Sequence, residues 1–330
     1  MEKKKVLILG TGGTIAGKAT VAGDNVGYKA GEVPVQELLA PLAKVASWMS
    51  DWQWEARQVA QLDSKDMDLA TWRALAQAVV AAGNDPDVAA VVITHGTDTL
   101  EETAFFLSLV LQSSNPVVLT CAMRPASALV PDGPQNLLDA LAVATNPHAQ
   151  GVCVVAAGTV HSAQSVAKAH TYRVDAFSSG DSGPLASVEE GRVRWFRANP
   201  SAQRLTVAGN ESDVGPDAVW QRAVTTAAWP RVEMITSHAG ADGALVHALL
   251  QPVPGVSPVV GLVVAGTGNG TVHASLLPAL DTARAQGVVV WRSTRCAFGQ
   301  IVDGPGTVWP PAVPLSPVKA RIALALALLS

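Results

Sequence analysis

Charged residues are scarce in this chain. Asp, Glu, Lys and Arg make up 15% of its 330 residues, and the formal net charge is -4. In an average soluble domain these four residue types make up roughly 25% of the sequence. The few basic residues form no dense patch, which argues against nucleic acid as a main partner. Low charge usually means that part of the surface is covered, and self-association is the simplest explanation.

A long uninterrupted hydrophobic run is also missing, although the mean hydropathy of +0.25 is high. The longest stretch without Asp, Glu, Lys or Arg covers residues 243–280, and it is broken by Pro252, Pro254 and Pro258 and by several glycines. A membrane-spanning helix needs about 20 consecutive apolar residues, so none is expected. The apolar run of MEKKKVLILG is shorter than the roughly 7 residues of a signal segment. We therefore expect a cytoplasmic protein with no membrane partner.

Cysteine is nearly absent. The chain contains Cys121, Cys153 and Cys296, and none of them lies in a Cys-x-x-Cys motif. An odd number of widely spaced cysteines indicates neither a disulfide framework nor a zinc site. This usage suits a reducing compartment.

What the chain does have is a regular alternation of short apolar runs with helical stretches. Runs rich in Val, Ile and Leu, bounded by turn residues, predict strands buried on both faces of a parallel sheet. Ala- and Leu-rich segments between them predict helices. This alternation is typical of an α/β fold. The expected strands cover 6–10, 89–96, 116–122 and 151–158, and the expected helices cover 66–82, 98–111 and 133–145.

The periodicity is interrupted once. Residues 196–214 are rich in Asn, Pro, Ser and Gly, a composition that predicts a linker. It would separate a large α/β catalytic domain, residues 1–195, from a smaller α/β domain, residues 215–330. In the smaller domain we expect strands at 232–237, 259–265 and 287–292, and helices at 242–250, at 271–283 and from 316 onward.

The first predicted strand ends in a glycine-rich turn, GTGGTIAG at residues 10–17. A dinucleotide fingerprint is disfavoured there, because Ile15 replaces its third glycine and the next segment is too rich in glycine to be a phosphate-binding helix. One remaining interpretation is a tight structural turn. The other is a ligand site, because Thr11 and Thr14 would lie at the carboxyl end of a parallel strand. A hydroxyl nucleophile beside amides that glycines expose is what acyl transfer requires.

A second polar cluster, THGTDT at residues 94–99, ends another predicted strand. Thr97 and Asp98 are good helix N-caps, which is the simpler interpretation. In the alternative, Thr97 takes part in catalysis with Asp98 and a lysine from elsewhere, because a threonine hydroxyl needs a base or a cation to react. His95 has no Gly-x-Ser-x-Gly elbow to accompany it, so we expect a hydrogen-bonded structural histidine.

Together these segments resemble the signatures of the bacterial-type L-asparaginases, threonine amidohydrolases that convert L-asparagine to aspartate and ammonia. The similarity extends over essentially the whole chain. The resemblance implies a large N-terminal α/β domain, a smaller flavodoxin-like C-terminal domain, and a homotetramer of intimate dimers in which the partner's C-terminal domain completes each site. The matching segments are GTGGTIAG (10–17), LDSKDM (62–67), THGTDTLEETA (94–104), AMRPASALVPDGPQNL (122–137), VAKAHTYRVDAF (166–177), GTGNGT (266–271), WRSTR (291–295) and LSPVKAR (315–321).

The resemblance also implies the catalytic residues. Thr14 matches the family nucleophile, and Tyr28 matches its partner on a mobile lid. Thr97, Asp98 and Lys168 match a second triad, in which the charge of Lys168 would favour deprotonation of the Thr97 hydroxyl. Asp98 would also bind the substrate's α-ammonium group. No metal or organic cofactor is implied. Spacing alone would make Lys168 a solvated lysine.

The substrate-binding residues depart from the family pattern beside Ser64, which matches the residue that holds the substrate's α-carboxylate. The family usually has Gln at the next position, where this chain has Lys65. An ammonium about 4 Å from the substrate's ammonium would be repelled by roughly 4 kcal/mol at an effective dielectric constant of about 20. We therefore expect Lys65 to point to solvent or to pair with Asp63 or Asp66.

A second departure lies in residues 296–317, where many members carry a glutamate that reaches the neighbouring subunit's substrate. Asp303 is the only acidic residue of this segment. Thr271 stands where some members have Asn or Ser, and its hydroxyl could support Asp98 across a dimer. Both departures predict weaker recognition of the α-ammonium group. The preferred ω-amide would then carry a modified or missing α-amino group, or L-asparagine would bind less tightly than is typical.

The leading functional prediction is hydrolysis of L-asparagine through an acyl-enzyme on a threonine. A glutaminase-asparaginase is the nearest alternative. Glutamine is longer than asparagine by one methylene group, which changes the free energy of binding by only about 1–3 kcal/mol. A non-catalytic amino-acid-binding module on the same fold is an alternative of another class. The presence of all five catalytic residue types argues against that module.

Overall fold

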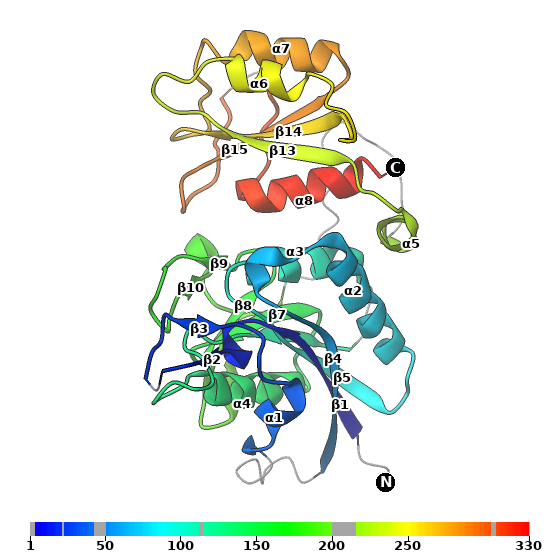
Figure 1. Cartoon of the computed structure of the whole chain (residues 1–330), viewed down its shortest axis with the longest axis vertical. Helices are drawn as coiled ribbons and strands as arrows, with labels where there is room; N and C mark the ends of the chain where they lie inside the picture. Colours follow the sequence, from blue (N-terminus) through cyan, green and yellow to red (C-terminus); the bar gives the residue numbers. More distant parts are fainter. Residues whose placement is uncertain are drawn as a thin grey trace. The chain divides into compact units, whose positions relative to one another are not determined.

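The computed structural model describes residues 4–21, 23–42, 51–111, 115–199, 216–304 and 308–329 (Figure 1). The chain divides into two compact units, Met1–Gln203 and Arg204–Ser330. Four residues of the predicted linker, 196–199, pack with the first unit, where the Phe196 amide donates to the Leu185 carbonyl. The rest of the predicted linker lies outside the described residues.

The first unit is built on one sheet of eight strands in the order β12-β11-β8-β7-β6-β5-β1-β4. The strands from β4 to β7 run parallel, whereas β8, β11 and β12 continue the sheet in antiparallel pairs. The four predicted strands are confirmed as β1, β5, β6 and β7. The bounds are β1 (Lys4–Gly12), β4 (Trp52–Leu62), β5 (Val88–Thr94), β6 (Val117–Thr120), β7 (Val152–Ala156), β8 (Thr159–Ser162), β11 (Ala186–Glu189) and β12 (Arg192–Trp195).

Helices cover both faces of this sheet (Figure 1). Helices α1 and α4 pack on one face, and α2 and α3 pack on the other. The predicted helices 66–82, 98–111 and 133–145 are confirmed as α2, α3 and α4. The α2 helix begins later than predicted, because Ser64–Asp66 forms a separate 3-10 turn and Asp68 caps α2 by accepting the Thr71 amide. The bounds are α1 (Val35–Leu39), α2 (Leu69–Gly83), α3 (Leu100–Val110) and α4 (Gly133–Ala144).

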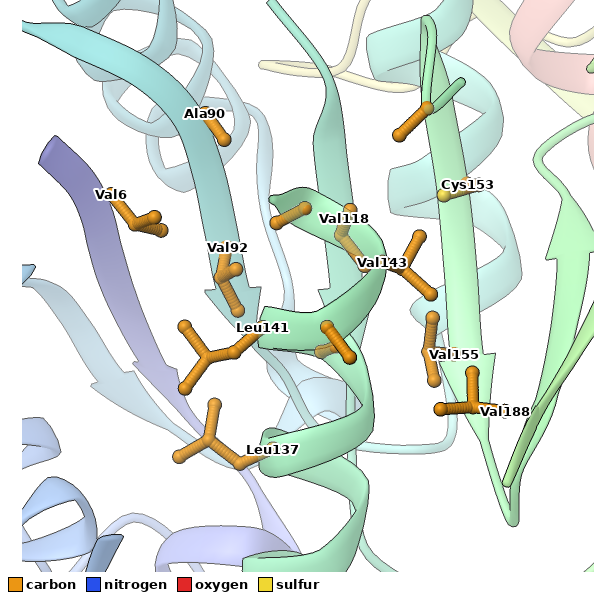
Figure 2. Close-up of a cluster of buried hydrophobic side chains, with 14 of the residues drawn as sticks. Val6, Ala90, Val92, Val118, Leu137, Leu141, Val143, Cys153, Val155 and Val188 are labelled. Atoms are coloured by element: carbon orange, nitrogen blue, oxygen red, sulfur yellow. The ribbon is translucent and has the colours of Figure 1, made fainter. Parts of the chain in front are cut away.

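The core explains why the central strands are apolar without alternation. Val6 and Ile8 of β1 face Leu137 and Leu141 of α4, as Figure 2 shows for three of these residues. The intervening Leu7 and Leu9 of β1 are also buried and point to the opposite face. Because helices cover both faces, each residue of the strand is removed from water.

Two short hairpins extend from the carboxyl edge of the sheet. One joins β2 (Lys18–Ala19) to β3 (Tyr28–Lys29), and the other joins β9 (Ala167–Lys168) to β10 (Phe177–Ser178). The described residues of the first unit also form the 3-10 turns Thr14–Ala16, Ser64–Asp66 and Gly180–Ser182.

The second unit contains a parallel sheet in the order β13-β14-β15. Helices α6 and α7 cover one face of this sheet and α8 covers the other (Figure 1). This is the smaller parallel-sheet domain that the sequence predicts. Within the described segments, no helix is both long and apolar enough to cross a membrane. The bounds are α5 (Pro216–Thr225), β13 (Arg231–Thr236), α6 (Ala244–Leu249), β14 (Val259–Gly266), α7 (Leu277–Ala285), β15 (Val289–Thr294) and α8 (Pro317–Ala327).

One helix boundary in the second unit is wrong in the sequence-based prediction. The sequence predicts a helix from residue 271 onward, but α7 starts at Leu277. Thr271 instead pairs with Thr267 through two backbone hydrogen bonds of 2.9 and 2.8 Å. Pro278 then stands in the first turn of α7, where its missing amide hydrogen has no effect on the helix.

Two buried histidines predict acid sensitivity of the first unit. Burial lowers the pKa of His95 and of His161 to about 4. The unfolded chain would take up these protons near pH 6.5, so the free energy of unfolding falls as the pH drops from 6.5 to 4 and levels off below that. Each histidine accounts for about 1.4 kcal/mol per pH unit in this window.

Urea unfolding between pH 7.5 and 4.5 measures this slope. We expect His161→Gln to unfold with a shallower pH dependence than the wild type, and His148→Gln, at an exposed histidine, to keep the wild-type slope. Equal slopes for all three proteins would contradict the assignment of acid sensitivity to the buried imidazole.

Candidate active site

The carboxyl ends of three neighbouring strands carry the predicted site residues. Thr14 follows β1, Ser64 follows β4, and Thr97 follows β5. After β1 the chain crosses to β4 on one side, and after β5 it crosses to β6 on the other side. Adjacent strands whose connections leave in opposite directions open a crevice at the carboxyl edge of an α/β sheet, and ligands bind there.

Glycines bring the three segments into close contact. A methyl group on Gly13 would lie 2.2 Å from the Gly96 Cα, and one on Gly96 would lie 2.5 Å from the Ser64 Oγ. Gly13 also has a φ of 81°, a conformation that favours glycine. The turns after β1 and β5 can therefore touch only because neither carries a side chain at these positions.

The first pair of functional groups is Thr14 and Tyr28. The Thr14 Oγ1 and the Tyr28 phenolic oxygen form a hydrogen bond of 2.6 Å. Thr14 is buried in the 3-10 turn after β1, and Tyr28 reaches it from β3. Burial raises the pKa of the Tyr28 phenol, and the Asp63 and Asp98 carboxylates raise it further, against the lowering effect of the Thr14 hydrogen bond. Tyr28 is therefore a neutral partner that orients the Thr14 hydroxyl.

The second cluster consists of Thr97, Asp98 and Lys168. The Lys168 Nζ donates to the Thr97 Oγ1 at 2.9 Å and to the Asp98 Oδ1 at 2.6 Å. Lys168 comes from the β9–β10 hairpin, and its side chain is 18% exposed. The solvated alternative for Lys168 is thus excluded. A glutamate of α3 supports the backbone here, because the Lys168 amide donates to the Glu101 Oε1 at 3.2 Å.

The helix-capping interpretation of Thr97 and Asp98 is wrong. The N-cap of α3 is Thr99, and no side chain caps that helix end. The Thr99 Oγ1 donates instead to the Ser64 carbonyl at 2.7 Å, and the Asp98 amide donates to the Ser64 Oγ at 3.1 Å. These bonds join the Ser64 turn to the Thr97–Asp98 turn. They leave both Thr97 and Asp98 side chains directed to Lys168.

The remaining polar residues of the two turns are structural. The Thr11 Oγ1 donates to the Thr94 carbonyl at 3.0 Å. His95 is fully buried, with hydrogen bonds to the Gly96 carbonyl and the Thr103 hydroxyl, which confirms the expected structural histidine. The expectation of exposed glycine amides is wrong for Gly13, whose amide donates to the Leu62 carbonyl at 2.8 Å.

Comparison with known proteins identifies the family of this chain. Residues 5–201 match the family model "Asparaginase, N-terminal", and residues 231–330 match "Glutaminase/Asparaginase C-terminal domain". The chain belongs to the bacterial-type L-asparaginase family. Members of this family are amidohydrolases.

Several relatives of the L-asparaginase family match over nearly the full length. A glutaminase-asparaginase of Pseudomonas fluorescens biotype A is 35% identical, covering 98% of this chain and 86% of the relative. L-asparaginase 2 of Escherichia coli (strain K12) is 33% identical, covering 98% and 88%. The crystal structure of a probable cytoplasmic L-asparaginase from Campylobacter jejuni superposes with a TM-score of 0.84 at 33% identity, covering 99% of this chain and 95% of that one.

Lys65 is paired in this member of the L-asparaginase family. Its ammonium lies 2.8 Å from the Asp63 carboxylate and 3.1 Å from the Asp66 carboxylate, and its side chain is 61% exposed. The expected pairing therefore forms with both acids at once. Its charge still reaches the site, where it opposes in small part the rise in the pKa of Tyr28 that burial causes.

The second unit holds the two other residues that the resemblance singles out. The Thr271 Oγ1 shares a hydrogen bond of 2.7 Å with the Thr267 Oγ1 in the turn after β14. The Asp303 carboxylate is already paired, because it accepts from the buried Arg292 guanidinium at 2.7 Å. Asp303 is therefore poorly suited to replace the family's glutamate.

Proposed function

We propose that the chain hydrolyses the side-chain amide of L-asparagine to L-aspartate and ammonia through an acyl-enzyme on Thr14. The observation that carries this proposal is the placement of two oriented threonine hydroxyls at adjacent strand ends. Thr14 is oriented by Tyr28, and Thr97 is bonded to Lys168. Nucleophilic catalysis by a threonine needs such a neighbour, because its hydroxyl is a weak nucleophile alone.

In the proposed reaction the Thr14 Oγ1 attacks the amide carbonyl carbon. The proton of the Thr14 hydroxyl is passed to the amide nitrogen, which leaves as ammonia. Water then cleaves the acyl ester, which restores the Thr14 hydroxyl and releases the acid. Thr97, Asp98 and Lys168 serve proton transfer and orientation. The Ser64 hydroxyl binds the α-carboxylate, and the open side of Asp98, which is 51% exposed, pairs with the α-ammonium.

An assay of ammonia release with L-asparagine and L-glutamine tests the activity, and hydroxylamine tests the intermediate. An acyl-enzyme partitions between water and hydroxylamine, so the proposal expects ammonia together with β-aspartyl hydroxamate. Ammonia without hydroxamate would contradict the acyl-enzyme. The absence of ammonia at high concentrations of both amides would instead favour a binding module.

Two observations, one in each unit, support a second substrate class, ω-amides with a modified or missing α-amino group. Lys65 adds a positive charge beside Ser64, although Asp63 and Asp66 offset it. The only acidic side chain of residues 296–317, that of Asp303, is already paired with Arg292. Both observations predict that the enzyme attracts the α-ammonium group of a substrate less strongly. Turnover of α-N-acyl and deamino analogues, compared with L-asparagine, distinguishes the two classes, and micromolar KM for L-asparagine with no analogue turnover excludes the second.

Lys65→Gln provides a direct measure of this charge. We expect the KM for L-asparagine to fall by about 2- to 5-fold, because an exposed and paired ammonium contributes only a small repulsion. The KM for a deamino analogue should stay the same, and raised salt should reduce the difference between the variants. Arg194→Gln, at an exposed arginine of β12 that pairs with Glu189, is the control. An increase in KM for L-asparagine would show that Lys65 helps to bind this substrate.

We also propose the organisation that the family implies. The two predicted domains, the first extended from 1–195 by the packed residues 196–199 and the second 215–330, would form a homotetramer of intimate dimers, in which Thr271 supports the partner subunit's site. Scarce charge and exposed apolar residues such as Leu129 and Phe298 support self-association. A cytoplasmic location is supported by three free cysteines and by the likeness to the Campylobacter enzyme.

A further inference from the structure

The hairpin that carries Tyr28 is short. It consists of two residue pairs, Lys18 with Lys29 and Ala19 with Tyr28. An isolated two-stranded hairpin is marginally stable even when it is longer than this. The position of the Tyr28 phenol over Thr14 therefore needs support from outside the hairpin.

Part of this support comes from the chain beneath the Tyr28 ring. A methyl group on Gly17 would lie 2.7 Å from the Tyr28 Cδ2, so the ring lies directly on the Gly17 backbone. The Gly31 amide donates to the Gly13 carbonyl at 3.1 Å, which fixes the chain just beyond β3. These contacts hold the base of the hairpin and leave the end of β2 to be fixed separately.

The end of β2 is fixed by Ser127. The Ala19 amide donates to the Ser127 Oγ at 2.8 Å. Ala19 lies directly opposite Tyr28 in the ladder. The Ala19 amide points out of the hairpin toward Ser127. This bond therefore joins the hairpin to another part of the sheet domain, next to the catalytic tyrosine.

Ser127 stands on a rigid support. Its loop follows β6 and is bound to Asp132, whose carboxylate accepts the Met123 and Arg124 amides at 2.9 Å each. Asp132 precedes α4 directly, and the Arg124 guanidinium donates to the Val130 carbonyl at 3.1 Å. The loop thus holds the Ser127 hydroxyl in place through contacts that are independent of the hairpin.

We infer that Ser127 is a positioning residue, which holds the β2–β3 hairpin so that Tyr28 meets Thr14. Ser127 acts through the Ala19 amide and does not touch the reacting atoms. The catalytic part of this inference rests on the proposed function. Without the Ser127 hydroxyl the hairpin opens more often, and the fraction of enzyme with a Thr14–Tyr28 bond falls. The groups proposed for substrate binding, Ser64 and Asp98, stay in place.

Two variants and one control test this role. We expect Ser127→Ala to lower kcat by about 3- to 10-fold, the range that one neutral hydrogen bond provides, and to change KM less than 2-fold. Ser127→Thr keeps the hydroxyl and should recover most of kcat. Ser187→Ala, at a serine of β11 that bonds only weakly to Glu189 at 3.4 Å, should behave as the wild type.

Hydrogen exchange tests the hairpin itself, independently of any activity. In Ser127→Ala the peptides that contain β2 and β3 should exchange faster, by about the same 3- to 10-fold factor, while peptides from β5 and β6 keep their rates. Unchanged exchange in β2 and β3 would overturn the inference whether or not the wild type releases ammonia. Faster exchange in a wild type that turns over no amide would retain the support of the hairpin and reject the proposed function. Faster exchange across the whole sheet domain would mean a general loss of stability, and would overturn the specific role.

Discussion

Thr14→Ala is expected to lower kcat for L-asparagine by about 10⁴-fold or more, because removal of a nucleophile leaves only binding and orientation. The folded state should change little. The Thr14 side chain gives up one hydrogen bond, to Tyr28, and the buried volume lost is a methyl and a hydroxyl group. Substrate binding should persist, since Ser64 and Asp98 come from the turns after β4 and β5.

Thr11→Ala is a matched control for this variant. Thr11 lies three residues before Thr14, near the end of β1, and is also buried, but its hydroxyl is bonded to the Thr94 carbonyl. We expect kcat within about 3-fold of the wild type and a lower melting temperature, since one buried hydrogen bond is lost.

A separate experiment identifies which threonine is the nucleophile. Rapid quenching of the wild type with L-asparagine, followed by peptide mass analysis, should place the acyl group on Thr14. An adduct on Thr97 would reverse the assigned roles, because Thr97 already bonds to Lys168 and is the second hydroxyl of the site. Residual activity above about 1% in Thr14→Ala would have the same meaning.

The central strands could be predicted from the sequence because their physics is local. A strand covered by helices on both faces must be apolar at every position, and the runs in β1, β5, β6 and β7 show this directly. This rule does not apply to β4, which lies at the edge of the sheet. It alternates half-buried residues such as Trp52 and Trp54 with exposed ones such as Glu55, so its segment contains no apolar run.

The site could be predicted only in part. Thr14 and Thr97 are visible because both follow apolar strands, and the carboxyl ends of parallel strands share one edge. Lys168 lies 70 residues beyond Asp98 along the chain and reaches it only through the β9–β10 hairpin. No local pattern marks a lysine placed in this way, so only the family resemblance identified it. No sequence pattern marks Ser127 either, since its contact with Ala19 spans 108 residues.

Lys168→Met is expected to lower kcat by about 10²- to 10⁴-fold, the range for loss of a group that assists proton transfer. Methionine keeps most of the length and the apolar stem of lysine. It removes the ammonium that lies 2.9 Å from the Thr97 Oγ1 and 2.6 Å from the Asp98 Oδ1. The Thr97 hydroxyl then loses its adjacent cation, and Asp98 loses its counter-ion. KM should rise less than kcat falls, because the Ser64 contact with the α-carboxylate remains.

Lys5→Met is the matched control, because the Lys5 side chain is 23% exposed, close to the 18% of Lys168, and also pairs with a carboxylate, that of Glu55. It lies at the start of β1, at the opposite edge of the sheet, so kcat should be unchanged. Lys168→Arg keeps the charge but spreads it over a planar group, which cannot place one donor close to both oxygens. We expect it to remain about 10-fold or more below the wild type. Full activity of Lys168→Arg would show that charge alone is required, whereas full activity of Lys168→Met would remove Lys168 from the reaction and leave Tyr28 as the sole partner of the threonine nucleophile.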